Sequence, residues 1–132
     1  MEQKLKHLEM LQAIINRMAS NSFLIKGWCV TLVAGLFALG TSTDKPNFVF
    51  LAYFPILMFW LLDGYYVWQE KLFRGLYDEV RQKPPNVIDF SMDTTSVRAS
   101  VPPHREVMLS NTIGLFYITL VIAVLFTWTT TR

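Results

Sequence analysis

The stretch FVFLAYFPILMFWLLDGYYVWQEKLFRGLYDEVRQK, residues 48–83, decides the fold of this chain. It begins with an apolar, aromatic-rich run, passes through Asp63 and continues into a charged, amphipathic segment. A helix rises about 1.5 Å per residue, and the hydrocarbon of a bilayer is roughly 30 Å thick, so one helix could cross a membrane and project into water. We therefore predict a transmembrane helix at 48–68, with a kink at Pro55 near its middle, and a cytosolic extension at 69–83.

The composition places the chain among membrane proteins. Of its 132 residues, 52% are hydrophobic and 17% are charged, and the apolar residues are concentrated in runs. Such clustering is unusual for a small soluble domain. The formal net charge of +2 is too small to indicate nucleic acid as a partner. The single cysteine, Cys29, lies in an apolar run and excludes an intramolecular disulfide.

Two further apolar segments are predicted to cross the bilayer. The first, 23–40, follows a helix-cap signal at Ser20-Asn21-Ser22, and only a short turn joins it to 48–68, so these two spans form an antiparallel hairpin. The third, 107–128, contains no charged side chain. The first span also carries small residues suited to close helix contact, namely Gly27, Ala34, Gly35, Ala38 and Gly40.

The remaining segments are predicted to be an amphipathic helix and a polar loop. Residues 1–20 place apolar side chains at helical spacing and charged ones on the opposite arc. Residues 84–106 are polar and irregular, with a weak alternating pattern at 87–92 that favours an extended conformation. The predicted fold class is all-α: a helical membrane protein with three transmembrane helices, the second extended into a cytosolic helix, plus an N-terminal amphipathic helix.

The distribution of Lys and Arg predicts the orientation in the membrane. The N-terminal arm through Lys26 carries four of these residues and the region 69–106 carries six, whereas the turn after the first span and the C-terminal tail carry one each. Because positively charged segments stay in the cytosol, we expect the N-terminus and the long loop to be cytosolic and the C-terminus to lie outside.

Lys26 and Asp63 form the most informative pair of positions. Counted inward from the short turn, both lie about 14 or 15 residues into their spans, which is roughly 21–22 Å of helix. Adjacent antiparallel helices therefore bring an intramembrane charge pair to one depth, where each charge offsets the cost of the other. Three interpretations stay open: a structural lock near the interface, an Asp63 that lines a pore in an oligomer, and a proton relay.

Polar side chains continue at helical spacing beyond Asp63. Tyr66, Glu70, Arg74, Tyr77 and Asp78 occupy this segment, and Glu70–Arg74 and Arg74–Asp78 are pairs of opposite charge four residues apart. One interpretation is a solvated face opposite a packing face. The other is a charged cytosolic vestibule below a pore, or a docking face for a partner.

Catalysis has little support in the sequence. The two histidines, His7 and His104, are far apart and belong to no motif, and neither a phosphate-binding glycine loop nor metal-ligand spacing occurs. We therefore expect no enzymatic activity, no catalytic residue, no metal site and no cofactor.

The segment Phe59-Trp60-Leu61-Leu62-Asp63-Gly64-Tyr65-Tyr66, followed by Gln69-Glu70-Lys71-Leu72-Phe73-Arg74 and Leu76-Tyr77, resembles the small SLATT-type transmembrane effectors of bacterial conflict systems. The resemblance covers about the middle third of the chain. It implies a membrane hairpin that continues into a cytosolic helix, and assembly into pores that damage the host membrane once a cytosolic sensor detects phage infection. It also implies an inner-membrane location and an architectural role for Asp63, Tyr66, Glu70, Arg74 and Tyr77.

These observations leave more than one function open. The chain is too small to enclose a conduit alone, so we expect a homo-oligomeric pore or channel that perturbs the bilayer. The alternative is a non-conducting adaptor that anchors a cytosolic partner through the N-terminal helix and residues 69–106. A phage holin also fits three spans, but its usual basic cytosolic tail is absent from Thr129–Arg132. A small multidrug transporter would need a fourth span and a glutamate in the first.

Overall fold

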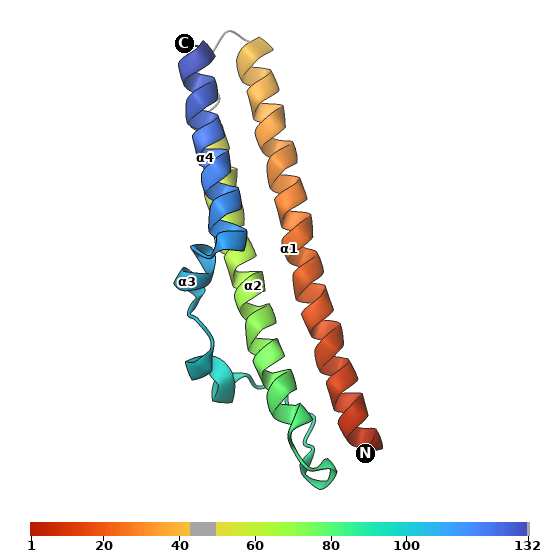
Figure 1. Cartoon of the computed structure of the whole chain (residues 1–132). Coiled ribbons are helices and arrows are strands. Elements are labelled where there is room, and N and C mark those ends of the chain that lie inside the picture. The colour runs from red at the N-terminus through yellow and green to blue at the C-terminus, as the bar shows by residue number, and fades with distance from the viewer. Residues whose placement is uncertain (43–49, 132) are drawn as a thin grey trace.

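The computed structural model describes residues 1–42 and 50–131, and these residues form a helical fold without strands (Figure 1). Three helices are long and apolar enough to cross a membrane, which agrees with the predicted fold class at that level. The elements, in chain order, are α1 (Glu2–Ser42), α2 (Tyr53–Arg81), the 3₁₀ helices η2 (Pro85–Val87) and η3 (Thr95–Ser100), α3 (His104–Met108) and α4 (Asn111–Thr131).

Helix α1 is a single continuous helix of 41 residues, so the predicted division into 1–20 and 23–40 is wrong. Ser22 lies inside α1 and therefore caps no helix end. Its buried hydroxyl donates a hydrogen bond to the Asp63 carboxylate. The buried positions keep one helical register on both sides of that point, which is typical of an uninterrupted packing stripe. Its members are His7, Leu11, Ile15, Ser22, Ile25, Cys29 and Val33.

Helix α2 begins later than predicted, and this changes the place of its proline. Residues 50–52 form a 3₁₀ turn and α2 starts at Tyr53, while 48 and 49 lie outside the described residues. Pro55 therefore stands in the first turn and not at the middle of the span. A proline there breaks no helical hydrogen bond, because the first N–H groups of a helix have no partner within it. The kink predicted at mid-span has no basis.

The third span is interrupted near its start. The chain leaves α3 at Met108, turns through Leu109 and Ser110 and begins α4 at Asn111, whereas a helix over 107–128 was predicted. The indole Nε1 of Trp60 donates a hydrogen bond of 2.8 Å to the carbonyl of Met108. That carbonyl is thereby satisfied from α2, which stabilises the end of α3 at this point.

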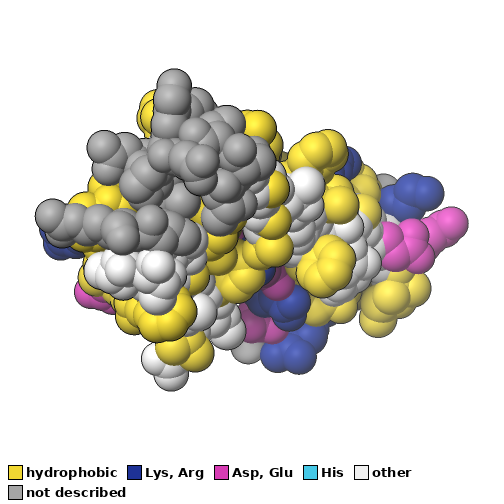
Figure 2. Space-filling model, turned by 90° about the horizontal axis from the view of Figure 1, so that it is seen from above, with side chains coloured by type: hydrophobic (Ala, Val, Ile, Leu, Met, Phe, Trp, Pro, Cys, Tyr) yellow, Lys and Arg dark blue, Asp and Glu magenta, His cyan; other side chains and the backbone are white. Residues whose placement is uncertain are grey.

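Along the helix axes the molecule divides into two halves of different composition, which we call the upper and lower halves after their place in Figure 1. Helix α1 runs the whole length beside the antiparallel α2, with α4 against them in the upper half and the segment between α2 and α3 in the lower half. The upper core is built around Cys29, Val33, Ile56, Tyr117 and Val124. Seen from above, hydrophobic side chains make up most of the described surface (Figure 2). The lower core is smaller and consists of Leu11, Leu76 and Val80 with their partly buried neighbours.

The segment from 84 to 106 is irregular, as predicted, but the extended conformation predicted for 87–92 is present only in part, because Val87 ends η2 and Ile88 is extended. It contains η2, η3 and α3, and 87–92 forms no strand. Phe90 has a positive φ of 54°, an uncommon conformation for a residue other than glycine. We call residues 88–94 the covering loop, because they lie over the lower ends of α1 and α2.

Candidate functional site

The Asp63 carboxylate is the centre of a polar cluster in the upper half. It is fully buried on α2, and its hydrogen-bond donors come from α1 and α4. Lys26 Nζ of α1 lies 2.6 Å from one carboxylate oxygen, which also accepts a bond of 2.9 Å from the Tyr117 hydroxyl of α4. The Ser22 hydroxyl donates to the other oxygen, and Lys26 Nζ lies 3.0 Å from Ser22 Oγ. The structure thus brings together the two residues that the sequence paired, and it adds Ser22 and Tyr117.

Aromatic rings enclose this cluster on the α4 side. The Trp60 and Tyr117 rings are stacked, with centroids 5.9 Å apart and an interplanar angle of 7°. The Lys26 ammonium also lies 5.9 Å from the Phe116 ring centroid, within the range of a cation–π contact. The Lys26 side chain keeps 24% of its surface exposed, whereas Asp63 has none. The cluster is therefore open to the surroundings only from the lysine side.

This geometry favours one of the three interpretations of Asp63. Its carboxylate accepts bonds from Ser22, Lys26 and Tyr117, which is the full satisfaction that a buried charge requires. Within a single subunit it faces the junction of three helices and lines no open channel. Its arrangement is that of a lock that holds α1, α2 and α4 in one register.

The predicted cytosolic face has an exposed part, with Arg74 and Asp78, and a half-buried part, with Tyr66 and Tyr77. Arg74 donates bonds of 3.0 and 2.8 Å to Glu70 from Nε and Nη2, and its side chain is 60% exposed. Tyr77 instead packs against the lower core. Tyr66 is half-buried and its ring lies edge-on to Tyr65. Asp78 is exposed and 3.6 Å from Arg81.

A groove accompanies the exposed part of that face. It has a volume of about 220 Å³ and lies between α1 and α2, lined by Gln12, Ile15, Arg74, Tyr77 and Asp78. Three of the five residues predicted for a docking face thus share one groove with α1. Glu70 and Tyr66 do not line it.

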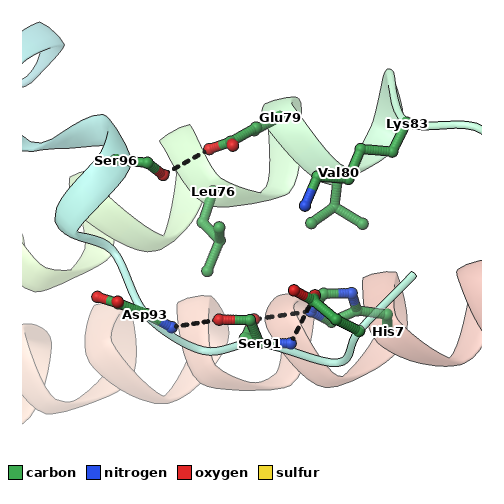
Figure 3. A pocket seen from close by; sticks show the side chains of 9 residues that line it. His7, Leu76, Glu79, Val80, Lys83, Ser91, Asp93 and Ser96 are labelled. Atoms are coloured by element: carbon green, nitrogen blue, oxygen red, sulfur yellow. Dashed lines mark hydrogen bonds between the residues drawn. The ribbon is translucent and has the colours of Figure 1, made fainter. Parts of the chain in front are cut away.

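A second polar site, which the sequence did not single out, surrounds His7 in the lower half (Figure 3). His7 is fully buried in the α1 packing stripe, and its Nε2 lies 2.8 Å from the carbonyl oxygen of Ser91 in the covering loop. A carbonyl only accepts hydrogen bonds, so Nε2 carries the hydrogen and Nδ1 of the neutral ring is an acceptor. Among the described residues nothing bonds to His7 Nδ1. A buried acceptor left unpaired costs about 1–3 kcal/mol.

A pocket of about 170 Å³ adjoins this histidine. Helices α1 and α2, the covering loop and η3 all contribute to its lining. The lining residues are His7, Leu76, Glu79, Val80, Lys83, Asp89, Ser91, Asp93 and Ser96. A signal for His7 existed in the sequence, because it stands one helical turn before Leu11 in the apolar stripe.

Hydrogen bonds hold the acidic side chains of this pocket in place. The Ser91 amide donates to Asp89, and this bond holds the pKa of Asp89 below its usual value. The hydroxyl and amide of Thr95 do the same for the pKa of Asp93. Glu79 accepts a bond of 2.8 Å from the Ser96 hydroxyl. The two aspartates are therefore ionised at neutral pH.

The other histidine has a packing role. His104 Nε2 lies 3.1 Å from the Leu61 carbonyl and donates to it, and its ring contacts Trp68 and Tyr65. Gly64 makes this approach possible, because a Cβ there would lie 2.5 Å from Met108 Cγ and 3.2 Å from His104 Nε2.

The described residues, 1–42 and 50–131, contain no group of three or more His, Cys, Asp or Glu side chains placed to hold a metal ion. Comparison of the chain with models of protein families, with curated proteins and with solved structures found no match.

Proposed function

We propose that this chain is the subunit of a homo-oligomer in the bacterial inner membrane, and that the oligomer is a pore-forming effector that perturbs the bilayer in antiviral defence. The N-terminus and the lower half lie in the cytosol in this proposal, and the C-terminus lies outside. The resemblance of 59–77 to SLATT-type effectors supports the role in defence.

The observation that carries the proposal is the unoccupied face of α1 in the upper half. A Cβ added to Gly27 or to Gly35 would meet nothing within 4 Å, so neither glycine serves contact within the subunit. Thr31 lies between them on the same face and is exposed, and its hydroxyl bonds to the Gly27 carbonyl. Small residues at this spacing allow the backbones of two helices to approach closely inside a membrane.

The ion pair between Lys26 and Asp63 is compatible with assembly into an oligomer. Because Asp63 and Lys26 neutralise each other within one subunit, a copy can pack against its neighbours without burying an unpaired charge. The conduit would then be lined by surfaces between subunits and not by Asp63.

The test combines a subunit count with a leakage assay. The full chain in nanodiscs is expected to be oligomeric, and in liposomes it is expected to release a trapped dye. Gly35→Leu places a bulky side chain on the open face of α1 and should reduce both oligomer and leakage. Thr119→Leu, a matched change on an exposed position of α4, should leave both intact. A monomer in nanodiscs, or an oligomer that releases no dye, would refute the proposal.

A second candidate function is supported by the groove between α1 and α2. Its exposed charged residues, Arg74 and Asp78, fit a non-conducting adaptor that docks a cytosolic protein, such as a sensor. This candidate predicts that the chain co-purifies with one specific protein, that Arg74→Ala releases it, and that membrane conductance is unchanged.

A further inference from the structure

We propose that the pocket beside His7 binds a small organic cation with a guanidinium or ammonium end group. The chemistry of its lining and its size carry this inference, which does not rest on the proposed function because binding belongs to the single subunit. Figure 3 shows the pocket between α1, α2 and the covering loop.

The charge of the lining selects a cation. Glu79, Asp89 and Asp93 contribute three carboxylates, and Lys83 is the one basic side chain among the residues that line the pocket. The pocket therefore has an excess of negative charge at neutral pH. Each carboxylate already has one oxygen engaged by a neighbouring hydroxyl or amide, so its position is fixed before a ligand arrives. Fixed acceptors of this kind suit a ligand rich in N–H donors.

His7 supplies an independent observation. Its Nε2 is committed to the Ser91 carbonyl, and its Nδ1 is a buried acceptor without a partner among the described residues. A ligand N–H directed at Nδ1 would satisfy that atom. Because His7 is fully buried, this bond requires a small outward shift of the covering loop, which contacts α1 through the bond from His7 to Ser91, through the Phe90 ring and through the lower core.

The volume limits the size of the ligand. The pocket measures about 170 Å³, and a cavity of roughly 150 Å³ in another protein takes up benzene. Because the pocket opens to solvent at Asp89, Asp93 and Ser96, this volume applies to the part of the ligand that the pocket encloses, on the order of six to ten non-hydrogen atoms. Agmatine, which carries a guanidinium at one end and an ammonium at the other, falls within this range and serves as the probe.

Isothermal titration of agmatine into the full chain in nanodiscs tests the proposal. Saturable binding is expected, with Glu79→Gln weakening it by about tenfold because one carboxylate partner is lost. Glu70→Gln removes an acid from the same helix outside the pocket and should leave the affinity unchanged. Inorganic phosphate, which would report on Lys83 alone, should not bind.

A second variant separates binding from folding. His7→Phe keeps the aromatic contact with Phe90 but removes both ring nitrogens, and it should weaken agmatine binding while the helical circular dichroism is retained. If this variant unfolds, Glu79→Gln still decides the question. Absence of agmatine binding, equal weakening by Glu79→Gln and Glu70→Gln, or phosphate binding in place of agmatine would each overturn the proposal.

Discussion

The pair Lys26–Asp63 allows a quantitative test of the internal lock. Replacing Lys26 by Met keeps the length and much of the apolar stem but removes the ammonium. The Asp63 carboxylate, which is fully buried, then keeps Ser22 and Tyr117 as donors but loses its counter-charge. The change therefore creates a buried charge without a partner of opposite sign.

The magnitude follows from the distance and the burial. At 2.6 Å and an effective dielectric constant of about 20, the attraction is about 6 kcal/mol before desolvation. Desolvation costs several kcal/mol for each ion, so the net stabilisation by the pair is small, but removal of one partner costs roughly 3–5 kcal/mol. Because the Lys26 side chain is 24% exposed, we take the lower end of this range and expect Lys26→Met to lower the free energy of unfolding by about 3 kcal/mol. For Asp63→Asn we expect the free energy of unfolding to fall by about 2 kcal/mol, since the remaining Lys26 ammonium can extend towards water.

The assay is a double-mutant cycle on the free energy of unfolding in mixed micelles, followed by tryptophan fluorescence. Lys26→Met with Asp63→Asn should cost about 3 kcal/mol and not the sum of about 5, which gives a coupling of about 2 kcal/mol. Arg74→Met, at an exposed pair with Glu70, is the matched control and should change stability by less than about 1 kcal/mol. Additive losses, with a coupling below about 0.5 kcal/mol, would refute the reasoning.

Two further predictions concern close packing and the covering loop. Gly64→Ala should destabilise the fold by about 1–3 kcal/mol, because its Cβ would overlap Met108, whereas Gly27→Ala, which points into open space, should be neutral or stabilising in the same unfolding assay. The pKa values of Asp89 and Asp93 are lowered in the fold, so their hydrogen bonds stabilise the covering loop above the unfolded-state pKa of about 4 and are lost as the pH falls through the folded values. Proteolysis within the loop should therefore accelerate below pH of about 4, and unchanged protection there would contradict this assignment.

Part of the site could be predicted because helices have a fixed rise. Lys26 and Asp63 stand at equal distance from a short predicted turn, and this predicts that they lie at one level of the two helices. The donors Ser22 and Tyr117 could not be found in the same way. Helix α4 is apolar on all sides, so no stripe in its sequence indicates how it is rotated against α2. Local propensity predicts that Ser22 belongs to a helix cap, because it does not reveal a tertiary hydrogen bond.

The errors in the fold have similar causes. The break at Leu109 and Ser110 coincides with the bond that the Trp60 indole donates to the Met108 carbonyl, and that contact lies 48 residues away along the chain. Hydropathy predicts Pro55 at mid-span, because it locates an apolar run but not the first helical residue of that run. The three apolar helices themselves were predicted correctly, since length and composition suffice for them.

The continuity of α1 has a mechanical consequence. It is one rod of 41 residues, about 60 Å long, and a single packing stripe along it carries both His7 and Ser22, one of the donors to Asp63. A rotation of the whole helix about its axis that draws His7 away from Ser91 would also turn Ser22 and Lys26 away from the Asp63 carboxylate, because all three side chains belong to one helix. A rigid rotation of α1 would therefore disturb both polar sites at once, whereas a shift of the covering loop would disturb only the site at His7.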